Sequence, residues 1–242
     1  MSEPVGTGAR RSLAEDLRDL DAETARLLAS VRRLDPGSLG APSRCEGWTR
    51  GHVLSHLARN ADALVRLTTA ATTGVAVPMY ASPEARDADI AAGAGRPLDE
   101  QLTDLESSAA RLATALQTLT GLDEDGLARR VEARDGVMVR AGFLPTMRLR
   151  EVVIHGVDLD ADLDFAGADP GVVVVLLADA VRRLRNNPAS PSLTIRTDEG
   201  DAWSIGDGVP TVSGTRAAML GWLTRGLTGG VTGELPLLPH GG

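Results

Sequence analysis

Two side chains with useful chemistry stand in the apolar segment REVVIHGVDL, residues 150–159. Glu151 and His155 are four residues apart, so on a helix they share one face. Leu144 and Leu159 fall on the same face, which predicts that it points inward. A buried carboxylate is costly unless it is paired with a charge or bound to a metal. A glutamate oxygen beside an imidazole nitrogen is a workable half of a metal site, although Glu and His at this spacing are also common on solvated helices.

The segment WTRGHVLSHLARNADAL, residues 48–64, supplies a second pair, His52 and His56. Both could be ligands, which would give one glutamate and three histidines. On a helical wheel His56 lies on the flank of the apolar face, and His52 lies about 40° further toward the polar face. His56 is therefore the better inward ligand, and two histidines with one carboxylate form the donor set of a catalytic zinc site. The alternatives are an exposed or first-turn His52 and a His56 that is only a hydrogen-bonded core residue.

The bulk composition is that of a globular protein without lysine. The chain has 242 residues, of which 43% are apolar and 24% charged, and a net charge of −8. No basic cluster is present, which argues against nucleic acid or an anionic membrane as a partner. The absence of lysine excludes Schiff-base chemistry on a side-chain amine, and the single cysteine, Cys45, excludes an intrachain disulfide. The sequence shows no signal-like segment and no apolar run of about 18 residues, so we expect a cytoplasmic protein.

Hydrophobic periodicity predicts four helices in the first two thirds of the chain. They cover about residues 9–34, 49–71, 97–119 and 143–160. Thr49 is placed to cap the second helix and the Gly74 region to end it. A long connection with a short helix at 83–92 follows. A hairpin is predicted at 129–141, with its turn at Asp135-Gly136. Four helices of this length are sufficient for a bundle.

The pattern changes after about residue 166. PGVVVVLLADAVRRLRNN predicts a helix, RAAMLGWLTRG predicts a final helix, and between them SLTIRTD, DAWSIGD and VPTVSGT predict short strands. This arrangement is typical of a small α+β domain. The predicted fold class is therefore mainly α with a small α+β domain, divided into residues 1–166 and 167–242. We expect His240 to be a residue of the C-terminal tail and not a ligand.

Three segments together resemble the mycothiol-dependent maleylpyruvate isomerases. They are EGWTRGHVLSHLARNADAL, PMYASPEARDADI and LREVVIHGVDL. The family consists of actinobacterial enzymes with an N-terminal DinB-like four-helix metal domain and a small C-terminal α/β domain, and the resemblance spans nearly the whole chain. It implies that His56, Glu151 and His155 are zinc ligands and that Arg86 is catalytically important. The implied histidine is the one that the helical wheel favours.

Arg86, Tyr80 and Cys45 each have a simpler interpretation. Arg86 lies in the long connection beside acidic residues and could form a surface salt bridge, but a planar guanidinium also suits two-point binding of a substrate carboxylate. Tyr80, the only tyrosine, could line the same pocket or pack in the core. His52 remains a second candidate for contact with the substrate. Cys45 has no recognisable activating partner in the sequence, so we interpret it as a structural thiol.

The resemblance implies a cis–trans isomerase that converts maleylpyruvate to fumarylpyruvate in gentisate-type aromatic catabolism. A thiolate from mycothiol would add to the conjugated double bond, allow it to rotate, and leave. Zinc would favour the thiolate or hold the keto-carboxylate of the substrate. The expected partners are a small substrate and a low-molecular-weight thiol, with neither nucleic acid nor a membrane, and we expect a monomer. Two alternatives stay open: a mycothiol S-transferase acting on another electrophile, and a non-enzymatic metal-binding protein.

Overall fold

The computed structural model describes residues 11–239. The chain forms two compact units that divide between Leu163 and Asp164, whereas the sequence placed the boundary after residue 166. The first unit is a helical bundle and the second combines helices with a small sheet, which confirms the predicted fold class. His240 lies outside the described residues.

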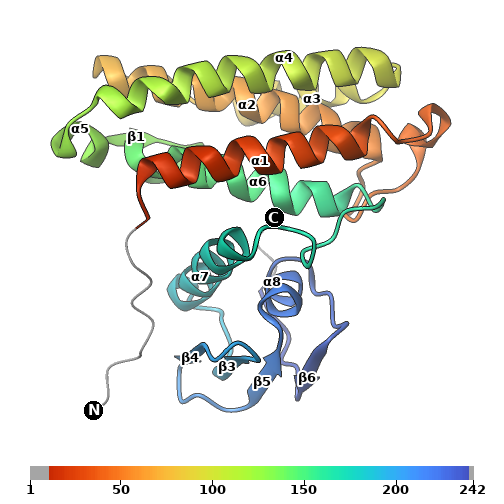
Figure 1. Ribbon diagram of the computed structural model, residues 1–242, viewed down its shortest axis with the longest axis vertical. Coiled ribbons are helices and arrows are strands. Elements are labelled where there is room, and N and C mark those ends of the chain that lie inside the picture. Colours follow the sequence, from red (N-terminus) through yellow and green to blue (C-terminus); the bar gives the residue numbers. More distant parts are fainter. Residues whose placement is uncertain (1–10, 240–242) are drawn as a thin grey trace. The chain divides into compact units, whose positions relative to one another are not determined.

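Four long helices form the first unit (Figure 1). They are α1 (Leu13–Val31), α2 (Arg50–Thr73), α4 (Leu98–Gln117) and α6 (Leu144–Asp158). Helix α2 packs against both α4 and α6, and α1 packs against α6 and α4. The core between them is built mostly from leucines, including Leu27, Leu57, Leu64, Leu105 and Leu149. Burial of these side chains supplies most of the driving force for assembly.

Local signals fix the ends of the helices that carry the candidate site. The Thr49 hydroxyl accepts a hydrogen bond from the His52 main-chain N–H and caps α2 as predicted. Gly74, in the left-handed region at φ 75°, ends the same helix. Pro145 lies in the first turn of α6, where its missing N–H has no intrahelical partner to lose. These signals therefore fix where α2 and α6 begin, and with it the positions of the candidate ligands on both helices.

Shorter elements connect the long helices. The short helix predicted at 83–92 within the long connection forms as α3 (Pro83–Ala94), which carries Arg86 and ends two residues later than expected. The predicted hairpin forms from β1 (Arg130–Glu132) and β2 (Met138–Arg140). Helix α5 (Glu124–Ala128) was not predicted. Short 3₁₀ segments also occur at Pro36–Gly40, Thr118–Gly121, Arg134–Gly136 and Ala141–Phe143.

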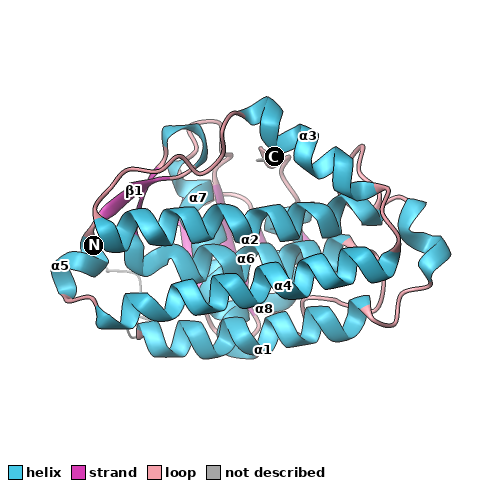
Figure 2. Ribbon diagram, turned by 90° about the horizontal axis from the view of Figure 1, so that it is seen from above, coloured by secondary structure: helices cyan, strands magenta, loops and turns pink. Residues whose placement is uncertain are grey.

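Helix α3 lies outside the four long helices, along the N-terminal half of α2 (Figure 2). Two glycines allow the two backbones to approach. A Cβ on Gly51 of α2 would lie 2.2 Å from the main-chain oxygen of Ala94. A Cβ on Gly93 of α3 would lie 2.2 Å from Oγ of Ser55. Neither contact leaves room for a side chain, so glycine at these positions determines how closely α3 can lie against α2.

The C-terminal unit consists of two helices and a four-stranded sheet. Its elements are α7 (Pro170–Asn186), β3 (Leu193–Thr197), β4 (Ala202–Ile205), β5 (Thr211–Gly214), α8 (Arg216–Arg225) and β6 (Val231–Gly233). The strand order is β4-β3-β5-β6, with β3 and β5 parallel and the other pairs antiparallel. Residues of α7 and α8, such as Leu177 and Trp222, share one core with strand residues such as Ile195. The edge strand β6 was not predicted.

None of the helices within residues 11–239 combines the length and the apolar character that a membrane-spanning segment needs.

The close contact of α2 with α3 generates a stability prediction. We expect Gly51→Ala to lower the free energy of unfolding by up to about 2 kcal/mol. Overpacking costs about 1–3 kcal/mol, and the higher helix propensity of alanine offsets about 1 kcal/mol of it. Urea denaturation measures the change. Gly95→Ala is the matched control, since a Cβ there meets nothing within 4 Å and the residue has an ordinary φ of −88°. Equal stability of the two variants would show that α3 does not depend on this contact.

Candidate metal centre

Three of the side chains singled out in the sequence meet inside the bundle. His56 comes from α2, and Glu151 and His155 come from α6. Oε2 of Glu151 lies 3.0 Å from Nε2 of His56 and 3.5 Å from Nε2 of His155. One ligand atom from each residue lies within 4.8 Å of the other two. Residues almost 100 positions apart in the sequence thus present one oxygen and two nitrogens to a common point.

The two helices place these groups by their periodicity. Glu151 and His155 are one turn apart on α6, so they lie on the same face. His56 is 4% exposed and stands among fully buried residues of α2 such as Val53 and Leu57. The imidazoles of His56 and His155 meet edge to face, with ring centroids 4.6 Å apart. The cluster is therefore held by packed helices and not by a loop.

The spacing of the donor atoms fits a zinc ion. Tetrahedral zinc with ligands at about 2.0–2.1 Å separates neighbouring ligand atoms by about 3.3 Å. The two carboxylate–imidazole distances of 3.0 and 3.5 Å bracket that value. Two neutral imidazoles and one carboxylate leave a fourth position open, as catalytic zinc sites do. The role of His56, Glu151 and His155 as ligands remains a prediction that this geometry supports.

The electrostatics of the cluster separate the two histidines. Burial lowers the pKa of His56 from 6.5 to about 4, so this imidazole is neutral at physiological pH. Burial also acts to lower the pKa of His155, but hydrogen bonds with Asp158, Cys45 and Glu151 outweigh it and raise that pKa well above 6.5. Burial acts to raise the pKa of Glu151, yet hydrogen bonds from His155 and His56 hold it well below the usual value. The metal-free cluster thus pairs one carboxylate with one imidazolium.

Arg86 lies beside this cluster, on the first turns of α3. Its Nη2 is 3.4 Å from Nδ1 of His56, and its Nη1 forms an ion pair of 2.6 Å with Asp87. The guanidinium carbon lies 6.0 Å from the Trp48 ring centroid and 5.7 Å from that of Tyr80. Only 13% of the Arg86 side chain is exposed, which is less than expected for a surface salt bridge. The structure brings Arg86 and Tyr80 together with the metal ligands.

The sequence reasoning did not single out Trp48, which links several of these groups. Its ring lies 5.4 Å from the His56 ring and stacks on His52 at 6.3 Å. Tryptophan is the strongest partner for a cation over an aromatic face. A usable signal was present: aromatic residues make up only 2% of the chain, and Trp48 stands in the same segment as the two histidines.

His52 has a local structural role. Its Nδ1 lies 2.8 Å from Oγ1 of Thr49 and accepts a hydrogen bond from the Thr49 main-chain N–H at 3.3 Å. Thr49 and His52 therefore form a reciprocal cap at the start of α2. His52 does not belong to the cluster that contains His56. Contact of His52 with a substrate remains a prediction.

Cys45 has partners that the sequence did not reveal. Its Sγ lies 3.7 Å from Nδ1 of His155, and its thiol donates a hydrogen bond to Oδ2 of Asp158 at 3.2 Å. The sequence showed no activating partner for Cys45, and the fold supplies a histidine and a carboxylate beside it. These partners come from positions more than 100 residues away in the sequence, so no local pattern could indicate them.

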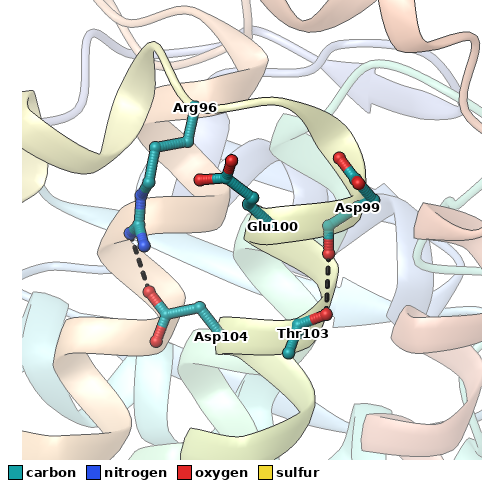
Figure 3. A pocket seen from close by; sticks show the side chains of 5 residues that line it. All are labelled: Arg96, Asp99, Glu100, Thr103 and Asp104. Carbon is teal, nitrogen blue, oxygen red and sulfur yellow. Dashed lines mark hydrogen bonds and ion pairs between the residues drawn. The ribbon is translucent and has the colours of Figure 1, made fainter.

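A shallow hollow near the start of α4 is lined by none of these residues. Its lining consists of Arg96, Asp99, Glu100, Thr103 and Asp104 (Figure 3). Arg96 forms an ion pair of 2.7 Å with Asp104, and the Thr103 hydroxyl donates to the main-chain oxygen of Asp99 at 2.8 Å. Arg96, Thr103 and Asp104 thus have partners within the protein, and Asp99 and Glu100 are exposed at an open depression, so we assign it no chemistry.

Comparisons with known proteins identify the family. Residues 20–160 match the family model described as the mycothiol maleylpyruvate isomerase N-terminal domain. The chain belongs to the mycothiol-dependent maleylpyruvate isomerase family. It is similar to two crystal structures of a mycothiol-dependent maleylpyruvate isomerase, one of them a histidine-to-alanine mutant, with TM-scores of 0.87 and 0.86 and 31% identity. Each alignment covers 95% of this chain and 97% of the chain in the crystal structure.

A comparison with curated proteins gave no match. The two structural matches and the family match confirm the family predicted from the three segments. They also confirm the prediction of an enzyme of the isomerase type, because the relatives are isomerases.

The two histidines of α2 give a first test of this centre. We expect His56→Ala to lose stoichiometric zinc, because it removes a donor atom of the cluster. His52→Ala should retain most of the zinc, since His52 caps the helix instead. Metal content after dialysis, measured by mass spectrometry, compares the two variants. Equal loss in both variants would show that the metal does not distinguish the His56 face of α2 from the His52 face.

The pKa values predict how zinc binding depends on pH. Zinc must displace the proton of His155, whose raised pKa keeps the imidazole charged at pH 6.5 and below. The apparent affinity should therefore fall about tenfold for each pH unit below 6.5, and more steeply near pH 4, where His56 also takes a proton. Titration calorimetry in buffers of different ionisation enthalpy should show release of about one proton per zinc near pH 6. A pH-independent affinity would contradict the assignment of His155.

Proposed function

We propose that this protein isomerises maleylpyruvate to fumarylpyruvate, with mycothiol as the thiol cofactor and a zinc ion held by His56, Glu151 and His155. The observation that carries the proposal is the three-donor cluster with the Arg86 guanidinium beside it, in a chain that belongs to this family. The relevant partners are a small dicarboxylate substrate and a low-molecular-weight thiol. The reducing cytoplasm, where such thiols stay reduced, is the compartment that suits this chemistry.

The reaction needs a temporary single bond where the substrate has a double bond. A thiolate supplies it by adding to the conjugated alkene and leaving after rotation, and a bound zinc ion supplies positive charge that favours the thiolate or polarises the keto-carboxylate. The protein's own residues must then hold the donor set, orient the substrate and balance the charge that develops.

Arg86 is suited to bind a substrate carboxylate. Its planar guanidinium offers paired N–H donors, and its position 3.4 Å from the His56 ring places those donors at the edge of the metal cluster. Addition of a thiolate to a conjugated keto-acid shifts negative charge onto the keto oxygen. A fixed guanidinium stabilises such charge without reorganising during the reaction.

Trp48 and Tyr80 hold Arg86 in this position. Their rings face the guanidinium from 6.0 and 5.7 Å, and the burial of Tyr80 raises its pKa, so its hydroxyl keeps its proton at neutral pH. The two rings restrict the Arg86 side chain and reduce water around it. A pre-positioned guanidinium loses less entropy when it binds a carboxylate.

The direct test uses purified protein with zinc, mycothiol and maleylpyruvate. We expect the ultraviolet absorbance to change as the isomer forms, and proton NMR to show a trans double bond with the thiol recovered unchanged. Accumulation of a thioether adduct would instead identify a thiol S-transferase. No turnover of substrate with any thiol would leave a metal-binding protein without this activity.

The source of the thiol can be tested with Cys45→Ser. We expect this variant to keep near-normal turnover when mycothiol is present, because a serine hydroxyl can still donate to Asp158. The wild type without added thiol should be inactive. Turnover by dialysed, thiol-free wild type that is lost in Cys45→Ser would make Cys45 the nucleophile and overturn the proposal.

Arg86→Lys tests whether Arg86 binds a carboxylate of the substrate at two points. The variant retains the positive charge but cannot bind a carboxylate at two points, so we expect a loss of activity of about 100-fold, comparable to removal of one charge-stabilising donor. Zinc content should not change. Arg111→Lys is a matched control, because Arg111 is 52% exposed and pairs with Asp62 on the surface. Full activity in Arg86→Lys would remove the two-point contact from the mechanism.

A further inference from the structure

A buried carboxylate lies behind the metal cluster. Asp158 is at the C-terminal end of α6, and its side chain is 0% exposed. Its Oδ2 lies 2.8 Å from Nδ1 of His155. The other ring nitrogen of His155, Nε2, faces Glu151. Asp158 therefore contacts His155 on the side of the imidazole that points away from the donor cluster.

This contact has a consequence for the proton on His155. A neutral imidazole carries one proton, and its position depends on which nitrogen has a hydrogen-bond acceptor. Oδ2 of Asp158 is an acceptor beside Nδ1, so the neutral ring keeps its proton on Nδ1. Nε2 then has its lone pair free, directed toward the point shared with His56 and Glu151.

The position of Asp158 is fixed from a second direction. The main-chain N–H of Arg44 donates to the main-chain oxygen of Asp158 at 2.9 Å. The Cys45 thiol donates to Oδ2 of the same residue at 3.2 Å. Both residues belong to the segment that leads into α2, the helix of His56. Asp158 thus joins that segment to α6, which carries the other two donors.

We propose that Asp158 is a positioning residue of the metal centre, which holds the His155 ring with Nδ1 protonated and Nε2 available to the metal. The inference rests on the proposed metal site but not on the isomerase reaction. A buried carboxylate is costly to retain without a charged or hydrogen-bonded partner. Carboxylates that orient a ligating histidine change metal affinity by about 10- to 100-fold when they are replaced.

The same atoms allow a competing interpretation. Sγ of Cys45, Nδ1 of His155 and a carboxylate oxygen of Asp158 also lie within 4.8 Å of one another and could hold a metal themselves. Nδ1 cannot carry a proton for Asp158 and bind a metal at the same time. The two interpretations therefore predict different zinc stoichiometries and different protonation of His155.

The experiment measures zinc affinity of the full chain by competition with a chelator. We expect wild type to bind one equivalent, and Asp158→Asn to bind it about 10- to 100-fold more weakly. A Co²⁺-loaded sample should also show a shifted visible spectrum, which a purely structural residue would not change. Asp16→Asn is the matched control, because Asp16 is another buried aspartate of the bundle, hydrogen-bonded to Thr146. It should bind zinc as the wild type does.

The outcomes separate the inference from the proposal on which it rests. Equal zinc affinity of Asp158→Asn and wild type would overturn the role of Asp158 but would not contradict the proposed metal site. A wild type that binds no zinc would overturn both, and two equivalents in the wild type would assign the second cluster as a metal site. If Asp158→Asn does not fold, ¹⁵N-histidine NMR of zinc-loaded wild type decides. A proton on Nδ1 of His155 supports the proposal, and a metal on Nδ1 overturns it.

Discussion

The structure of the site depends on the carboxylate of Glu151, which is only 16% exposed. Burial alone would raise the pKa of Glu151, but hydrogen bonds from His155 and His56 hold it well below the usual value, so the carboxylate stays ionised. A buried anion of this kind needs a positive partner. In the metal-free protein one such partner is the proton on His155, whose pKa is raised by Asp158, Cys45 and Glu151 against the effect of burial. Arg150 is a second, with Nη2 3.4 Å from Oε1 of Glu151. A divalent cation would also supply positive charge beside Glu151, so a bound metal and the proton on His155 compete with each other.

This constraint explains why the surroundings of the cluster are so closely packed. Burial lowers the pKa of His56 to about 4, with the charges of His155 and Arg86 acting in the same direction, so this imidazole stays neutral. Helix α3 adds a cation, Arg86, next to a site that must itself attract a cation. The two aromatic rings and Asp87 limit that conflict, since the ion pair with Asp87 and the faces of Trp48 and Tyr80 offset the guanidinium charge. Arg86 can thus remain close without repelling a bound metal strongly.

The sequence predicted the parts of this arrangement that follow from helical periodicity. The bundle helices, the Thr49 cap and the shared face of Glu151 and His155 all follow from spacing and capping, which are local rules. The rest depends on tertiary contacts. Helix α3 is short and weakly amphipathic, so its sequence does not show which face packs on α2. Only that packing places Arg86 beside His56. Cys45 and Asp158 are separated by 113 residues, and the short elements α5 and β6 are too brief to produce a periodic pattern.

The orientation of His155 also bears on the source of the nucleophile. Cys45 lies on the Nδ1 side of the imidazole, together with Asp158, whereas Glu151 and the donor cluster lie on the Nε2 side. The ring of His155 thus stands between the only thiol of the chain and the point where a metal would sit. From this position, Sγ of Cys45 could not easily reach both the metal and the substrate. The arrangement supports a mechanism in which the reacting thiol comes from a small molecule and Cys45 serves the hydrogen bonding of Asp158.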